Sequence, residues 1–387
     1  MSLSWRTPVV QESAQQRLQA AAGPDGRLVV VVVGTDRRAH DPGRTDTILV
    51  VSLDVENGRV GVLSIPRDTR VRVPGRGYNK INMVFPAGGP GALMETVSAL
   101  LGVPVEGYVR VDFQAFIGLV DALGGVDVTV ERPMRYVDRA QGLDIRLPAG
   151  RQHLNGEQAL DFVRFRADGL GDVSYDPGRD VYVGRVERQH QFLRALADAA
   201  LRPSTLLALP RIVRELYGRV ETDLRLDLAL AAAAWLAEKG NVPLKTGVLP
   251  GWPGQVNGVS YWLPDAGRAR RVVEEVLGTQ RTPVVVAVLN ANGVGGSAAR
   301  VAQELAEEGV VVSEVGNAST FSQEHTWVWA TRREHLGAAL QVAGLLGVGS
   351  DRVRVAPESG GDGSGEPGHQ GAEVVVWVGK DLAGVIR

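Results

Sequence analysis

Three runs of hydrophobic, largely β-branched residues open the first compact part of the chain, at residues 28–33, 47–53 and 60–65. The first run is continuously apolar, and the other two repeat it with few polar breaks. Continuous apolar runs are typical of strands covered on both faces, whereas a strand with one face in water alternates. Polar residues follow each run, and an Asn-Gly pair separates the second from the third. The pattern therefore predicts three interior strands.

Helical spacing follows the third run. Residues 90–101 place Leu93 and Val97 on one face before Gly102 ends the helix. A second helix begins after the N-cap residue Asp112, with apolar side chains at i, i+3, i+4 and i+7 (Phe113, Phe116, Ile117 and Val120). A strand is predicted at 126–130, and further helices at 154–160, 183–201 and 226–238. Strands that alternate with helices indicate a layered α/β domain.

The last hundred residues repeat this alternation on a smaller scale. A strand at 284–289, a helix at 297–308 and a strand at 310–315 form one βαβ unit, and a strand at 374–378 follows the flexible, Gly-rich segment 358–368. We expect an α/β fold, with a central mixed sheet flanked by helices in the first domain and a small α/β domain at the C-terminus. The expected parts are an N-terminal tail at 1–27, the first domain at 28–265, a linker at 266–282 and the second domain at 283–387.

The turn inside the βαβ unit carries the pattern GxGxxA, from Gly293 to Ala298, and Glu314 stands near the end of the next strand. On its face this is a dinucleotide site. The unit, however, lacks a second mononucleotide-binding half, and a tight strand-to-helix turn also requires glycine. We therefore expect the structural role.

Composition excludes several classes of protein. Net charge is −2, which gives no global reason to expect nucleic acid as a partner. The absence of cysteine excludes a disulfide framework, a thiol nucleophile and cysteine-ligated zinc, and the six histidines show no HExxH spacing. No run reaches the roughly eighteen apolar residues of a membrane helix, and the N-terminus lacks a signal-peptide core. As given, the chain is expected to be soluble.

Charged residues gather where the first strands end. The loop between the first two strands holds Asp36, Arg37, Arg38, Arg44 and Asp46, and Arg67 and Asp68 follow the third strand. Open α/β sheets place ligands at such an edge. Arginine suits phosphate oxygens, and carboxylates facing the same space can hold Mg²⁺. The residues predict a site for a phosphorylated ligand with a metal, unless they pair with one another as solvated surface ion pairs.

Two further basic groups lie in the same domain. Lys80, one of four lysines in the chain, follows the charged region directly. In the predicted helix 183–201, three side chains share one face at i, i+3 and i+4 (Arg185, Arg188 and Gln189). Arg164 and Arg166 stand two apart just upstream, so on a strand they would point the same way. Each group alone could be ordinary solvated surface, but three in one domain favour an anion site.

These segments resemble the LytR-CpsA-Psr family of bacterial cell-envelope proteins. The resemblance is carried by GTDRR (34–38) with RTDT (44–47), SIPRDT (64–69), KIN (80–82), YVRVDFQAFIGLVDALGGVDV (108–128), FVRFR (162–166) and GRVERQ (184–189), in the family's order. It covers residues 28–200 densely. Residues 283–387 resemble the LytR C-terminal domain, an accessory module of some members, which would bind a partner or a wall component.

The resemblance implies a Mg²⁺-dependent phosphotransferase that attaches glycopolymers from an undecaprenyl-pyrophosphate carrier to peptidoglycan during cell-wall assembly, with pyrophosphatase activity as a side reaction. Asp36 and Asp46 would be the metal ligands, and Arg44, Arg67 and Asp68 the catalytic residues. The pyrophosphate would be bound by Arg44, Arg67, Lys80, Arg164, Arg166, Arg185, Arg188 and Gln189. A hydrophobic cavity would seat the prenyl tail; Phe113, Phe116, Ile117 and Leu119 are its candidate lining, although an apolar helix face is more often plain core.

The chain departs from the family in two places. The family keeps an aspartate two residues before Gly184, where this chain has Tyr182, and Asp176 and Asp180 lie farther back in an enlarged insert at 168–183. Asp68 and Asp168 remain the candidates for the base that deprotonates the acceptor. Members also start with a membrane helix, so the expected location is extracytoplasmic, anchored to the cytoplasmic membrane through a lost N-terminal helix. The alternative function is a polyprenyl-phosphate or wall-glycan binding protein without turnover.

Overall fold

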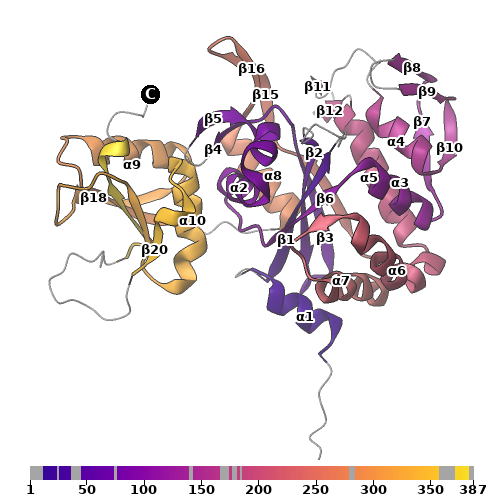
Figure 1. The fold of residues 1–387 in the computed structure, drawn as a ribbon, viewed down its shortest axis with the longest axis horizontal. Helices are drawn as coiled ribbons and strands as arrows, with labels where there is room; N and C mark the ends of the chain where they lie inside the picture. The colour runs from indigo at the N-terminus through magenta and orange to yellow at the C-terminus, as the bar shows by residue number, and fades with distance from the viewer. Residues whose placement is uncertain are drawn as a thin grey trace, which may run out of the picture.

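The computed structural model describes residues 12–23, 26–35, 45–73, 76–138, 143–165, 174–176, 181–183, 185–278, 284–356 and 371–382. The first domain is built on a six-stranded mixed sheet with the order β13-β6-β1-β2-β3-β14 (Figure 1). Its strands are β1 (Arg27–Thr35), β2 (Thr45–Asp54), β3 (Arg59–Ile65), β6 (Gly107–Val111), β13 (Glu221–Thr222) and β14 (Leu244–Val248). The three interior strands predicted from the hydrophobic runs are confirmed.

The registers explain why the central residues of these strands are mostly apolar. β1 pairs antiparallel with β2 and parallel with β6, and β3 pairs antiparallel with β2 and parallel with β14. Successive side chains of a strand point to opposite faces. Val29, Val31 and Val33 therefore enter one hydrophobic core, and Leu28 and Val30 enter another. A strand between two cores is therefore mostly apolar, and a polar side chain buried on it needs a partner.

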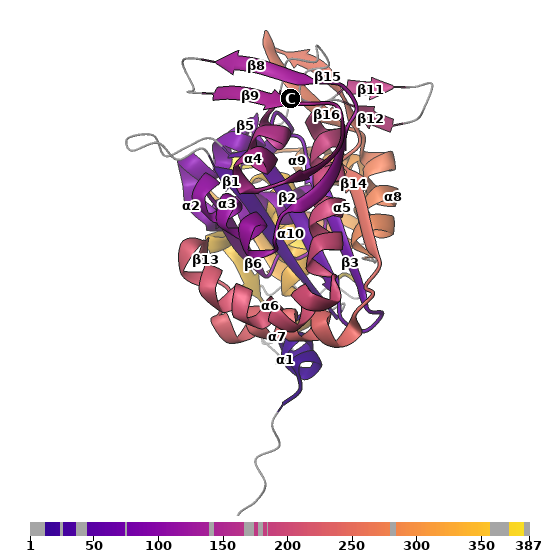
Figure 2. The same ribbon diagram turned by 90° about the vertical axis from the view of Figure 1, so that its right-hand side faces the viewer.

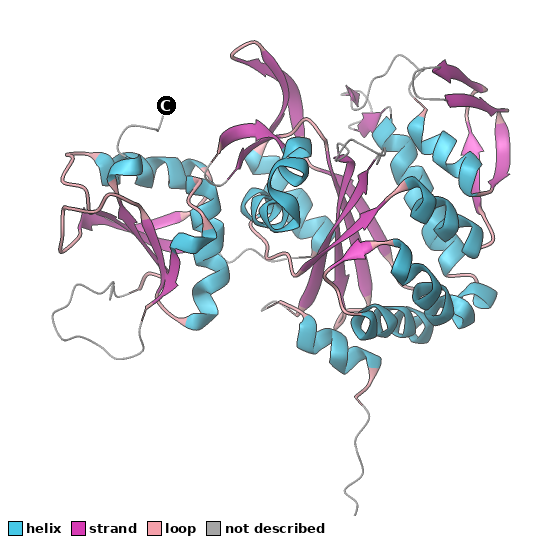
Figure 3. Ribbon diagram, viewed as in Figure 1, coloured by secondary structure: helices cyan, strands magenta, loops and turns pink. Residues whose placement is uncertain are grey.

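Helices cover both faces of the sheet (Figures 1 and 3). On one face lie α2 (Val84–Leu101) and α8 (Ala266–Leu277). The other face and the lobe beyond it carry α1 (Ala14–Ala21), α3 (Phe113–Ala122), α4 (Gly156–Arg164), α5 (Arg185–Ala200), α6 (Pro203–Leu216) and α7 (Leu226–Lys239). The predicted N-cap of α3 is confirmed, since the Asp112 side chain accepts a hydrogen bond from the Ala115 amide. The predicted strand 126–130 forms outside the main sheet, as β7 (Val126–Val130) paired with β10 (Gly150–Leu154).

Four hairpins project from the same end of the first domain, opposite α1 (Figures 1 and 2). They are β4 (Arg70–Val73) with β5 (Gly77–Lys80), β8 (Met134–Asp138) with β9 (Leu143–Leu147), β11 (Ser174–Asp176) with β12 (Val181–Val183), and β15 (Gly251–Val256) with β16 (Val259–Pro264). The strands β2 and β3 also meet this end with Thr45 and Ile65. The charged residues that precede β2 and follow β3 are thus brought to one edge.

Two predicted boundaries are wrong. Residues 266–277 are not linker but α8, because Val273, Val276 and Leu277 are buried in the core of the first domain. The N-terminal 1–27 is not all tail, because α1 buries Leu18 against the core that contains Trp235 of α7. Both segments are mostly charged or polar in sequence, but each carries a short apolar stripe that is buried.

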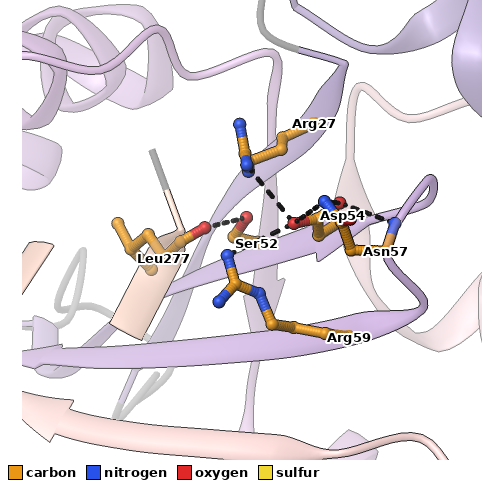
Figure 4. A network of polar contacts seen from close by, with 6 residues as sticks. All are labelled: Arg27, Ser52, Asp54, Asn57, Arg59 and Leu277. Carbon is orange, nitrogen blue, oxygen red and sulfur yellow. Dashed lines mark hydrogen bonds and ion pairs between the residues drawn. The ribbon is translucent and has the colours of Figure 1, made fainter. Parts of the chain in front are cut away.

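A polar network fixes the far end of the sheet (Figure 4). Asp54, with a side chain only 3% exposed, forms ion pairs of 3.3 Å with both Arg27 and Arg59 and accepts hydrogen bonds from Asn57. Burial acts to raise the pKa of Asp54, but the hydrogen bonds from Asn57 and the two arginines outweigh it, so the pKa lies below its usual value. Ser52 donates a hydrogen bond to the Leu277 carbonyl at the end of α8. The network therefore ties the β2–β3 turn to the neighbouring elements.

The second domain has a five-stranded sheet with the order β18-β17-β21-β19-β20. Its elements are β17 (Val285–Asn290), α9 (Ser297–Glu307), β18 (Val311–Asn317), β19 (Trp327–Ala330), α10 (Leu336–Leu346), β20 (Val353–Val355) and β21 (Val374–Val378). The predicted βαβ unit is confirmed by the parallel pairing of β17 with β18. Side chains hold its glycine turn: Asn290 donates to the Val294 carbonyl, and Ser297 donates to Asn292. These contacts agree with the structural role expected for the turn.

The two domains contact each other through α10 and the β4–β5 hairpin. Arg72 of β4 forms a 2.7 Å ion pair with Glu304 of α9 and also donates to the Leu345 carbonyl. Gly344 of α10 lies against Ala99 of α2 so closely that a Cβ would collide. Burial raises the pKa of Glu304, although Arg72 acts in the opposite direction. The second domain is therefore docked through a largely buried ion pair and a close helix contact.

Candidate functional site

Four charged side chains meet at the hairpin end of the sheet. The Nη1 atom of Arg67 lies 2.6 Å from Oδ1 of Asp46, and its Nε atom lies 3.8 Å from Oδ2 of Asp68. The Nζ atom of Lys80 lies 2.9 Å from Oδ1 of Asp68. Each side chain keeps between 25% and 38% of its surface exposed. The cluster is thus ordered by its own ion pairs and still open to an incoming anion, which could exchange with the carboxylates.

Local backbone contacts give the cluster its shape. The Thr69 hydroxyl and amide both donate to the Pro66 carbonyl, which closes a turn around Arg67 and Asp68. The β4–β5 hairpin then reverses the chain and pairs Arg70 with Lys80, so Lys80 returns beside Asp68. The Asn82 amide donates to the Arg67 carbonyl and anchors the end of the hairpin. The sequence spacing from 67 to 80 therefore encodes one compact unit.

Helix α5 brings further side chains to the same region. Gln189 donates a 3.3 Å hydrogen bond from Nε2 to the Thr47 hydroxyl on β2. Arg188 turns to α4, where it donates to the Phe165 carbonyl and lies over the Phe165 ring. Burial lowers the pKa of His190 to about 4, and the nearby Arg194 adds to the effect. His190 is therefore neutral at physiological pH.

An apolar pocket of about 220 Å³ opens beside the cluster, between the sheet and helices α3, α4 and α5. Three of the four predicted tail-lining residues, Phe113, Phe116 and Leu119, line it. Ile117 instead packs against Gly156 at the start of α4. The guanidinium of Arg164 lies 4.4 Å from the centre of the Phe113 ring, which places this cation on the pocket wall. An apolar chain carrying an anionic head group would suit this arrangement.

A second, more polar pocket of about 250 Å³ is lined by both members of the Asp46–Arg67 pair. Its walls come from the ends of β2 and β3, from Gln189 and from the β15–β16 hairpin. Asp46, Thr47 and Gln189 line both pockets. The charged cluster therefore stands at the junction of an apolar and a polar cavity.

Several predicted site residues lie outside the described residues, namely Asp36, Arg37, Arg38, Arg44, Arg166 and Asp168; of Arg185 the backbone alone is described. The structure brings Asp46, Arg67, Asp68, Lys80 and Gln189 together. Arg164 is the last residue of α4, so this position is helical and not on a strand, and Arg166 lies outside the described residues. Arg188 is on α5 as predicted, but its side chain contacts Phe165. The roles assigned to all these residues stay predictions.

The sequence reasoning missed the contribution of the β15–β16 hairpin. Pro253, Ser260, Tyr261 and Trp262 line the polar pocket nearly 200 residues after Asp68. An Asn-Gly pair at 257–258 flanked by strand-like residues does signal a hairpin. Nothing in that signal tells which part of the domain the hairpin reaches.

The LytR_cpsA_psr family model matches residues 7–277, and a second model, LytR cell envelope-related transcriptional attenuator, matches residues 283–382. The chain belongs to the LytR-CpsA-Psr family. It is similar to the polyisoprenyl-teichoic acid–peptidoglycan teichoic acid transferase TagU of Oceanobacillus iheyensis, with 31% identity over 257 residues, which is 64% of this chain and 75% of TagU.

Two solved structures are similar to this chain over about two thirds of its length. The crystal structure of TagV from B. subtilis is 30% identical with a TM-score of 0.53, over 66% of this chain and 98% of that one. A structure of TagT bound to LI-WTA is 26% identical with a TM-score of 0.50, over 65% of this chain and 91% of that one. Among the described residues, none of the helices combines the length and apolarity needed to cross a membrane.

Proposed function

We propose that this protein transfers a glycopolymer from a polyprenyl-pyrophosphate carrier to peptidoglycan during cell-wall assembly. The observation that carries the proposal is the charged cluster of Asp46, Arg67, Asp68 and Lys80 at the junction of an apolar and a polar pocket. Family membership and the similarity to proteins named as teichoic acid transferases support it. The prenyl tail would occupy the apolar pocket, and the pyrophosphate would meet Arg67 and Lys80.

The reaction follows from this placement. A hydroxyl oxygen of the acceptor forms a bond to the phosphorus that carries the glycopolymer, and the bond from that phosphorus to the bridging oxygen breaks. Prenyl phosphate leaves with the electron pair, and Asp68 takes the hydroxyl proton. Phosphoryl transfer depends mostly on positioning and charge neutralisation, which Arg67 and Lys80 supply, and the motif match adds Arg44, Arg166 and Arg185. With water in place of the acceptor, the same steps give a pyrophosphatase side activity.

Mg²⁺ is the cofactor we propose. Within the part of the chain that is described, no three acidic or histidine side chains gather as a ready-made metal cage. Mg²⁺ needs none, because it is usually held by one or two carboxylates plus substrate phosphates and water. Asp46, at the pocket junction, and Asp36 would provide the carboxylates. The ion would neutralise charge on the phosphate oxygens.

We also propose an extracytoplasmic location with membrane anchoring.

The test is phosphate release from geranyl or farnesyl pyrophosphate by the purified chain, with Mg²⁺ and with EDTA. Arg67→Ala should lower metal-dependent release by about 10³-fold, the scale of a transition-state arginine, while keeping the fold. Arg225→Ala is the matched control, since Arg225 is 83% exposed and pairs only with its neighbour Asp227 among the contacts described. Equal activity of Arg67→Ala and Arg225→Ala would contradict the proposal.

A second candidate function is binding of polyprenyl phosphate or wall glycan without turnover. The observation that favours it is Tyr182, which stands where the family keeps an aspartate. No release from the wild type, with prenyl pyrophosphate still protecting the protein against thermal unfolding, would support this candidate over the transferase.

A further inference from the structure

The β15–β16 hairpin is fixed relative to the charged cluster at its base. Trp262 is buried, its amide donates a 2.9 Å hydrogen bond to the Asp68 carbonyl, and its indole Nε1 donates to the Leu249 carbonyl. Thr69 forms a parallel bridge with Trp262. These contacts attach the hairpin to Asp68 and Thr69, so the hairpin residues keep a defined position at the polar pocket.

The upper part of the hairpin extends beyond the sheet at the pocket end of the domain (Figures 1 and 2). Its strands pair from Gly251–Pro264 to Val256–Val259, and Asn257 and Gly258 form the turn with φ values of 51° and 77°. Such left-handed values suit a tight two-residue hairpin turn. The hairpin is therefore a regular, twisted ribbon and not a loose loop.

The geometry of phosphoryl transfer indicates which substrate the polar pocket would hold. In phosphoryl transfer the attacking and leaving oxygens lie roughly in line on opposite sides of the phosphorus. A prenyl phosphate that leaves toward the apolar pocket therefore requires the acceptor hydroxyl to reach the phosphorus from another direction. The polar pocket is a second cavity that Asp46 borders, and Asp68, the proposed base, is among its lining residues.

The lining of the polar pocket suits a sugar. Its lining residues include an aromatic residue and a proline from the hairpin, a serine and two acidic residues (Tyr261, Pro253, Ser260, Asp46 and Asp68). Sugar C–H groups carry a small positive charge and pack on the negative face of an aromatic ring, while hydroxyl groups bond to the carboxylates. A cavity of about 250 Å³ has room for about one sugar residue, since an engineered cavity of about 150 Å³ holds benzene.

We propose that the polar pocket under the β15–β16 hairpin is the acceptor subsite, where one aminosugar of a glycan strand stacks on Tyr261. The inference rests on the proposed transferase function and assigns its acceptor side. Tyr261 is then a specificity-determining residue for the acceptor. The Nζ atom of Lys80 lies 5.9 Å from the Tyr261 ring centre, so the ring also borders the cluster.

The experiment compares two readouts for the full chain: phosphate release from geranyl pyrophosphate without glycan, and transfer from a synthetic prenyl-pyrophosphoryl N-acetylglucosamine to a disaccharide of N-acetylglucosamine and N-acetylmuramic acid. Tyr261→Ala should raise the KM for the disaccharide about tenfold, the upper scale of one aromatic contact, and should lower transfer more than it lowers glycan-free release. Tyr261→Phe keeps the ring and should restore the KM. Trp252→Ala is the matched control, an aromatic residue of the same hairpin that is 52% exposed outside the pocket.

An unchanged disaccharide KM in Tyr261→Ala would overturn the subsite, as would equal losses in Tyr261→Ala and Trp252→Ala. A fall of glycan-free release in Tyr261→Ala that matches the fall in transfer would also overturn it, by assigning the ring to the donor. If the wild type neither releases phosphate nor transfers, the proposed function fails. Saturation-transfer NMR with the disaccharide then judges the pocket separately: binding lost in Tyr261→Ala supports the pocket as a glycan site, and binding retained overturns it.

Discussion

The apolar pocket predicts how affinity depends on the length of the prenyl tail. Burial of one CH₂ group is worth about 0.8 kcal/mol, so a five-carbon isoprene unit brings at most about 4 kcal/mol. Ordering of the flexible tail opposes this, and a net gain of about 2 kcal/mol, or roughly 30-fold in Kd, is reasonable per unit. A volume of about 220 Å³ exceeds the roughly 150 Å³ cavity that holds benzene by about half, enough for one to two units.

Inhibition of phosphate release, or calorimetric titration, with dimethylallyl, geranyl and farnesyl pyrophosphates measures the effect. We expect a gain of roughly 30-fold from the first to the second ligand and less than about threefold from the second to the third. Val163→Trp fills the pocket from α4 and should remove most of the first gain, whereas Val137→Trp, the same change at a position 60% exposed, should keep it. Equal affinities for all three tails, or equal behaviour of the two variants, would refute the assignment of the pocket to the tail.

Three further predictions concern stability and docking. Asp54→Asn should lower the free energy of unfolding by about 2–3 kcal/mol at pH 7, somewhat less than the loss of a fully buried pair. The pKa of Asp54 in the folded state lies below its ordinary 3.8, so the contribution of the carboxylate is lost as pH falls below 3.8. Urea titrations of wild type and variant should therefore converge in acid. Gly61→Ala drives a Cβ into the Val276 carbonyl and should cost about 3 kcal/mol, whereas Gly91→Ala, with open space around it, should be neutral or stabilising; equal melting temperatures would place α8 elsewhere. Arg72→Ala and Glu304→Ala should show a coupling of about 2 kcal/mol in a double-mutant cycle of β4 hydrogen exchange, and additive effects would deny that the ion pair docks the domains.

Local patterns predicted most of the elements. The hydrophobic runs predicted β1, β2 and β3, and the i, i+3, i+4 spacing after Asp112 predicted α3, because burial of each element is written in its own residues. The charged segment with Arg268, Arg270 and Arg271 was read as helical but assigned to a linker, although its Val273 and Val276 are buried in the first domain. A charged segment with a narrow apolar stripe has the composition of a linker and the spacing of a helix. Whether its apolar face is buried depends on the element that packs against it, which the local sequence does not show.

For the candidate site, too, some features could be predicted from the sequence and others could not. The meeting of Asp46 with Arg67 was predictable, because the start of one antiparallel strand and the end of the next lie at the same sheet edge. The position of the β15–β16 hairpin was not, since its contact with Asp68 joins residues nearly 200 apart and depends on the parallel pairing of β14 with β3. The different partners of Arg188 and Gln189, Phe165 and Thr47, also depend on neighbours that helical spacing does not describe.

The β4–β5 hairpin belongs to both the charged cluster and the contact between the domains. Arg72 holds Glu304 of the second domain, and Lys80 on the paired strand holds Asp68. Thermodynamic linkage makes such a coupling reciprocal. If a ligand at the charged cluster orders the hairpin and so raises the affinity of a second ligand that binds only to the docked second domain, the second ligand must raise the affinity of the first by the same factor. Occupancy of the charged cluster and occupancy of the second domain would then be measurable as two ends of one equilibrium.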